Sequence, residues 1–132
     1  MILVDSSAWI EFLRDTGGPA GERLATLLAE DHPLAISGAI EMEILAGARD
    51  EVHLLDLRRL LARATLVETT AADFSDAAMI FRRCRRDGST VRRLIDCLIA
   101  AAARRLDIPV LHADADFEAM ARSGVIRVAA TN

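Results

Sequence analysis

Five short apolar runs recur along the chain of 132 residues, and stretches with helical spacing separate them. Apolar runs that polar residues bound on both sides are typical of strands covered on both faces. Strands that alternate with helices predict an α/β fold with a mainly parallel central sheet of about five strands. The predicted strands cover residues 2–4, 34–36, 65–67, 109–111 and 125–128.

Helical patterns fill the intervals between the runs, and some have recognisable start signals. Asp73 or Thr70 is the start signal of the fifth helical pattern, and Thr90 is that of the sixth, since such side chains can cap a first turn. The sequence "DGST" at 87–90 is a turn between two helices rather than a linker, so residues 1–132 are predicted to form one domain. The helices are expected over residues 7–14, 20–30, 39–47, 51–63, 71–86, 91–106 and 115–122.

The composition excludes several classes of protein. Hydrophobic residues make up 52% of the chain, which is too much for a disordered protein. No apolar stretch is long enough to cross a bilayer and the N-terminus lacks the features of a signal peptide, so no membrane association is expected. Cys84 and Cys97 have no CxxC spacing and are expected to be reduced thiols in a cytoplasmic protein.

Acidic residues follow the predicted strands. Asp5 ends the first run, while Asp114 and Asp116 follow the fourth. The second run leads into a helix that carries Glu41 and Glu43; their side chains lie about 200° apart around it, so only one can face the strand ends. Because the carboxyl ends of parallel strands meet at one edge of a sheet, we expect these acids to converge there.

Asp96 lies inside the apolar sequence "LIDCLIAAAA", where a charge rarely stays unpaired. Helix capping is the alternative interpretation for three of the acids. Asp5 and Asp114 would cap the helices that follow them, and Asp96 would cap a helix that begins at Cys97.

A cluster of carboxylates without Cys or His at ligand spacing favours Mg²⁺ or Mn²⁺ over zinc. The sequence "DADADFE" is not a calcium loop of the EF-hand type, because Ala119 and Val125 occupy the positions that require Gly and Glu. His112 is available as a ligand, although a lone histidine more often packs in a core.

Four segments together resemble a known family. In their order and spacing, "ILVDSSAW", "EMEILAG", "LIDCLIAAAA" and "LHADADF" resemble the PIN-domain ribonucleases, and specifically the VapC toxins of bacterial toxin–antitoxin pairs. The resemblance implies a PIN-like α/β/α sandwich and an endoribonuclease that depends on Mg²⁺ or Mn²⁺. It also implies an RNA substrate, a VapB-like antitoxin partner and a homodimer.

The resemblance also implies roles for individual residues. Ser6 or Ser7 matches the hydroxyl that follows the first acid, and both are predicted to bind substrate. His112 stands where many members of the family have Thr. Glu43 is expected to orient the attacking water or to bind in the outer shell of the metal. The predicted metal ligands are Asp5, Asp96 and Asp114, and the predicted catalytic acids are these three with Glu43 and Asp116.

All 16 basic residues are Arg in a chain of net charge −4, and six of them lie in "RRCRRDGSTVRR" at 82–93. Against the single Asp87, this segment has a local charge of 6 − 1 = +5. Arginines pair well with phosphates, so RNA contact is predicted here, first at Arg92 and Arg93, which stand closest to Asp96. The chain has one Trp and four Phe, too few for extensive base stacking.

Other functions remain open from the residues alone. They are a metal-dependent phosphohydrolase, a DNA nuclease, and a non-catalytic binding module whose acids cap helices. A phosphotransferase of the haloacid dehalogenase type needs an Asp where this chain has Ser7. That class and the response-regulator receiver domains also need a Lys, which the chain lacks.

Overall fold

The computed structural model describes residues 1–132 and contains one four-stranded sheet with parallel neighbours throughout. The sheet has the order β3-β2-β1-β4, so β1 is internal, and all three of its residues are buried. The predicted α/β fold with a parallel sheet is confirmed. The strands are β1 (Ile2–Val4), β2 (Leu34–Ser37), β3 (Thr65–Val67) and β4 (Val110–Leu111).

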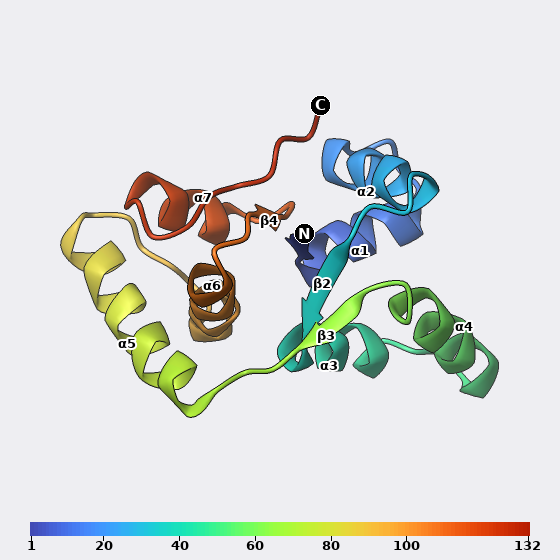
Figure 1. Ribbon diagram of the computed structural model, residues 1–132, viewed down its shortest axis with the longest axis horizontal. Coiled ribbons are helices and arrows are strands. Elements are labelled where there is room, and N and C mark those ends of the chain that lie inside the picture. The colour runs from blue at the N-terminus through green and yellow to red at the C-terminus, as the bar shows by residue number, and fades with distance from the viewer.

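Seven helices connect and cover the strands (Figure 1). In Figure 1, α5, α6 and α7 lie on one side of the strands, and α1, α2 and α4 lie on the other. No helix combines the length and the hydropathy that a membrane span requires. The helices are α1 (Ser6–Arg14), α2 (Pro19–Ala29), α3 (Gly38–Ala46), α4 (Glu51–Leu61), α5 (Ala71–Arg86), α6 (Leu94–Leu106) and α7 (Ala115–Arg122).

The only tryptophan fixes the first helix against the first strand. Trp9 in α1 is fully buried, and its Nε1 donates a hydrogen bond to the carbonyl oxygen of Val4 at 3.1 Å. A buried indole N–H requires such a partner. The chain between these two residues, which includes Asp5, is therefore held in one position at the end of β1.

The sheet has four strands rather than about five. The segment expected as the fifth strand forms a single parallel bridge between Val110 and Val128. Val110 donates to the carbonyl oxygen of Arg127 at 3.0 Å and accepts from the N–H of Ala129 at 2.8 Å. This segment therefore pairs with β4 at one position only and is not a strand.

Helix α6 begins at Leu94, three residues later than predicted. Arg92 and Arg93 precede the helix, and their backbone N–H groups both donate to the carboxylate of Asp116, each at 3.0 Å. Thr90 is therefore not the N-cap of this helix, and the prediction that it would be is wrong. Arg93 stands at the N-cap position without a capping side-chain bond.

A buried ion pair ties α5 to α6. Asp73 is fully buried and accepts hydrogen bonds from Nε and Nη2 of Arg105 at 3.0 and 3.1 Å. Arg105 also donates to the carbonyl oxygen of Glu68 at 2.7 Å. Of the two candidates for the start of α5, Thr70 is the N-cap, and Asp73 completes a capping box with it. The hydrogen bond from Arg105 is the main reason that the pKa of Asp73 lies below its ordinary value.

Both cysteines lie in this helix pair. Cys84 in α5 and Cys97 in α6 are buried and free, as predicted. Burial is the main cause that raises the pKa of Cys97 to about 12, and the nearby Cys84 adds to the effect. A thiol with this pKa carries almost no thiolate at neutral pH and is chemically unreactive.

Replacing Arg105 with Met should lower the free energy of unfolding by about 2 kcal/mol at neutral pH, because the buried Asp73 carboxylate loses its charged partner. A lowered pKa stabilises the fold above the ordinary value of 3.8 and stops doing so as pH falls through the folded-state value. The loss should therefore shrink in acid, when urea unfolding is compared at neutral pH and at about pH 3.

Arg104→Met is the matched control for this experiment. Arg104 is the preceding residue of α6, is exposed and makes no ion pair, so its loss should change stability little. Equal losses in the two variants would contradict the assigned role of the Asp73–Arg105 pair.

Candidate metal centre

Four aspartates gather at the carboxyl edge of the sheet. Asp5 follows β1 and Asp114 lies just after β4, and these two strands are neighbours. Asp96 lies in the first turn of α6, and Asp116 lies in the first turn of α7. The predicted convergence of acids at the strand ends is present in the structure, with the helix starts supplying the other two.

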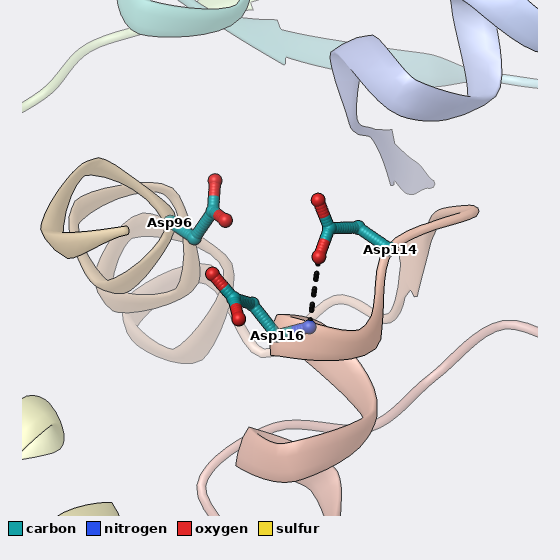
Figure 2. A group of neighbouring side chains, drawn as sticks. All are labelled: Asp96, Asp114 and Asp116. Carbon is teal, nitrogen blue, oxygen red and sulfur yellow. Dashed lines mark hydrogen bonds between the residues drawn. The ribbon is translucent and has the colours of Figure 1, made fainter. Parts of the chain in front are cut away.

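Three of these residues form a compact acid trio, Asp96, Asp114 and Asp116 (Figure 2). One carboxylate oxygen from each lies within 4.8 Å of the others. Asp96 and Asp116 are only 1% and 2% exposed, so water screens their charges poorly. Asp5 lies outside the trio, although its charge is close enough to act on Asp96. Asp116, expected as a further contributor, thus belongs to the tightest group.

Asp116 is held as a carboxylate by backbone donors. Its two oxygens accept the N–H groups of Arg92 and Arg93, each at 3.0 Å. Burial by itself would raise the pKa of Asp116, but the N–H of Arg92, the Asp96 side chain and the N–H of Arg93 together bring it below its ordinary value. This side chain therefore stays ionised without a metal.

Asp96 has the opposite environment. Burial is the main cause that raises its pKa to about 8, and the hydrogen bond with Asp116 and the charge of Asp5 raise it further. The trio therefore holds a proton on Asp96 at neutral pH. A divalent cation bound there would replace that proton, because it offers the same oxygen atom a stronger positive charge.

Two buried carboxylate oxygens have no hydrogen-bond partner, Oδ1 of Asp5 and Oδ2 of Asp96. The other oxygen of Asp5, Oδ2, accepts from the N–H of Ser7 at 3.0 Å and from its hydroxyl at 2.6 Å. Burial is the main cause that raises the pKa of Asp5, against these bonds. Buried polar atoms are rarely left unpaired, and a cation is the partner that carboxylate oxygens accept most readily. The residues present therefore fit a divalent metal ion.

Glu43, rather than Glu41, faces the acids. Its carboxylate accepts from the hydroxyl of Ser6 at 3.3 Å and forms a short ion pair with the guanidinium of Arg93. Glu41 instead lines a hollow beside α4, together with Arg58. The helical spacing left this choice open, and the packing of α3 decides it.

His112 positions the loop that carries two of the acids. Its Nδ1 accepts the N–H of Asp114 at 3.0 Å, and its ring packs against Phe117 with centroids 5.3 Å apart. Nε2 lies 3.1 Å from Oε1 of Glu118. Because Nδ1 accepts the N–H of Asp114, this side chain supports the loop, while the buried Nε2 has no hydrogen-bond partner. The sequence left its role open, and only the burial of the loop reveals it.

Capping and site formation turn out to be compatible. Asp5 is the N-cap of α1, and Asp114 is the N-cap of α7, where it accepts from the N–H of Asp116 at 2.8 Å. Asp96 is not an N-cap, since it is the third residue of α6. The capping interpretation is therefore correct for two acids and wrong for Asp96.

The residues predicted to bind substrate all make contacts within the site. The hydroxyl of Ser7 accepts from the N–H of Ala113 at 2.9 Å while it donates to Asp5, so it links the ends of β1 and β4. Nε and Nη2 of Arg92 lie 3.6 and 3.8 Å from oxygens of Asp116 and Asp114. The side chain of Arg92 is 72% exposed.

Comparisons with known proteins agree with this geometry. Residues 2–123 match the family model of the PIN domain. The chain is 45% identical over 124 residues to ribonuclease VapC11 of Mycobacterium tuberculosis, with 92% of each chain covered.

Two solved structures show the same fold. They are VapBC2 of Rickettsia felis bound to a promoter DNA fragment (TM-score 0.76, 16% identity, 98% of each chain) and VapC20 of M. tuberculosis, a toxin that cleaves the sarcin–ricin loop (TM-score 0.65, 21% identity, 90% of this chain and 94% of that chain). The family match and the 45% identity settle the classification. The chain belongs to the PIN-domain family and, within it, to the VapC ribonucleases.

Proposed function

We propose that this protein is an endoribonuclease that depends on Mg²⁺ or Mn²⁺ and acts as the toxin of a toxin–antitoxin pair. The observation that carries the proposal is the acid trio, with the unpartnered oxygens of Asp5 and Asp96 beside it. Cap residues alone would not leave two buried carboxylate oxygens without a partner. The ribonuclease activity of the relatives supports RNA as the substrate.

Asp5, Asp96 and Asp114 are the proposed ligands of the metal, with Asp116 beside them. When bound, the ion lowers the pKa of a water molecule, orients the scissile phosphate and neutralises charge that develops on it. A small number of protein ligands is enough for Mg²⁺, because this ion keeps several coordination positions for water and phosphate. The buried setting of Asp96 keeps these charges poorly screened, so their attraction for a cation is strong.

Glu43 and the two arginines act around the metal. Glu43 is placed by Ser6 and Arg93, and we assign it to orienting the attacking water. Arg92 and Arg93 are proposed to contact the substrate phosphates. To do so, each guanidinium must leave the carboxylate beside which it now lies. The half-exposed guanidinium of Arg93 can do so without moving the backbone that holds Asp116. Ser6 and Ser7 complete the proposed substrate contacts.

A VapB-like antitoxin is the proposed partner protein, and a homodimer is the proposed assembly. The support for the antitoxin is that similar folds were solved as VapBC complexes, including that of Rickettsia felis.

Purified protein without antitoxin should cleave a structured RNA in the presence of Mg²⁺ or Mn²⁺, and EDTA should stop the reaction. The reason is that a phosphate anion is repelled by Asp5 and the acid trio unless a bound cation offsets their negative charge. Gel analysis of end-labelled RNA and DNA substrates of equal length, assayed side by side, measures this. Cleavage that continues in EDTA, or of DNA alone, would contradict the proposal.

Asp96→Asn should raise the melting temperature of the metal-free protein and abolish cleavage. The pKa of Asp96 is about 8 when folded and 3.8 ordinarily, so the folded state binds more protons and stability falls as pH rises between these values. Asn carries no charge and escapes this fall. The advantage of the variant should therefore grow from about pH 4 to about pH 8 and then level off.

Asp76→Asn is the matched control for Asp96→Asn, because Asp76 is an exposed aspartate of α5 without an ion pair. Melting curves with and without Mn²⁺ should show stabilisation by the ion in the parent and in the control, and much less in Asp96→Asn. An Asp96→Asn protein that still gains the full shift from Mn²⁺ would overturn the assignment of this ligand.

Replacing Arg92 and Arg93 together with Ala should weaken RNA binding in EDTA and reduce the slope of log Kd against log salt by about 1 to 2. Their backbone N–H groups remain, so Asp116 keeps its hydrogen bonds and the fold should persist, as circular dichroism can verify. An unchanged slope would show that these side chains serve only as partners of the acids.

A further inference from the structure

Four arginines surround a second hollow, between α5 and α6 and apart from the acid trio. It has a volume of about 230 Å³, and its remaining lining is Met79 and the buried Ile80. We call it the arginine pocket and define it by Arg82, Arg83, Arg86 and Arg104.

None of these guanidinium groups forms an ion pair. The arginines that do pair with acids are elsewhere, namely Arg63, Arg92, Arg93, Arg105 and Arg127. The protein has more acidic than basic residues and a net charge of −4, and yet no acid pairs with the four arginines that line this hollow. Such a group repels itself until an anion binds, so it favours a ligand of high negative charge.

The chemistry of the pocket fits a phosphate group better than an acidic peptide. Guanidinium forks bind phosphate oxygens in pairs, and several of them can share one phosphate. Peptide docking relies on aromatic or large apolar anchors, whereas this pocket contains no aromatic side chain and offers only Met79. The absence of an aromatic ring also argues against the stacking of a base.

The pocket lies on the same helix pair as the acid trio. Arg86 ends α5, and the link to α6 contains Arg92 and Arg93, whose backbone holds Asp116. Along α6, Arg104 follows Asp96 by eight residues, which is about 12 Å of helix. Cationic side chains therefore continue from the acids along the link and onto the two helices.

We propose that the arginine pocket binds a backbone phosphate of the RNA at a distance from the bond that is cut. This inference rests on the proposed function, because it assumes an RNA strand that also enters the acid trio. The pocket provides affinity and positions the RNA, while the acids perform the hydrolysis. Contact at both the acid trio and the arginine pocket would favour RNAs whose length or folding lets them reach both sites.

The test is RNA binding in EDTA, where no cleavage occurs, across a series of salt concentrations. Arg86→Gln with Arg104→Gln removes one charge from each helix of the pocket; both residues are exposed, so the fold should tolerate the change. Kd should rise about tenfold, and the slope of log Kd against log salt should fall by about 0.7, the value for one lost phosphate contact with a single strand.

Arg58→Gln with Arg59→Gln is the matched control. It changes the net charge equally, at two exposed and unpaired arginines of α4, which lies on the other side of the strands (Figure 1). Kd and slope should stay near the parent values. Equal effects in both double variants would overturn the inference, since only net charge would then matter.

Two further probes identify the source of the anion. If inorganic phosphate raises the melting temperature through the pocket arginines while RNA binding does not depend on them, the pocket takes free phosphate and the RNA assignment is wrong. Poly-glutamate binding that needs these arginines, again without an effect on RNA, would point to an acidic protein partner. A parent that binds RNA through the pocket but never cleaves it contradicts the proposed function and leaves the pocket assignment in place.

Discussion

The two hydrogen bonds from the backbone of Arg92 and Arg93 to Asp116 are the interaction on which the site depends. They join the link before α6 to the first turn of α7. They also keep Asp116 ionised, so the proton that the crowded acids retain falls on Asp96. Without them, the trio would lose both its spacing and its division into one charged and one protonated aspartate.

Sequence patterns gave the parallel sheet and the convergence of acids, because both follow from local periodicity and from the direction of the strands. The start of α6 was missed, since Thr90 has the residue type of a cap and nothing near it reveals that Asp116 takes the N–H groups of the link. The choice between Glu41 and Glu43 and the support from His112 depend on tertiary packing, which no local spacing records. The segment expected as the fifth strand pairs with β4 at Val110 alone, which periodicity does not predict.

The arginine-rich segment looked uniform in the sequence, and the fold divides it. Arg92 and Arg93 face carboxylates, and Arg85 lies over the ring of Phe81 at 5.6 Å from its centroid. The remaining three turn to the arginine pocket, where Arg104 joins them from a distant part of the chain. Arginines that are neighbours in the sequence thus contact different groups, because the helical geometry points their side chains in different directions.

The buried cysteines of α5 and α6 can be used to measure how often the two helices separate. Since the pKa of Cys97 is about 12 and both thiols are buried, an alkylating reagent can react only when the helices part. The rate of alkylation then reports how often that separation happens. Three of the four pocket arginines lie on α5, and Asp96 lies on α6. The same rate therefore reports how long the arginine pocket and Asp96 keep their relative positions.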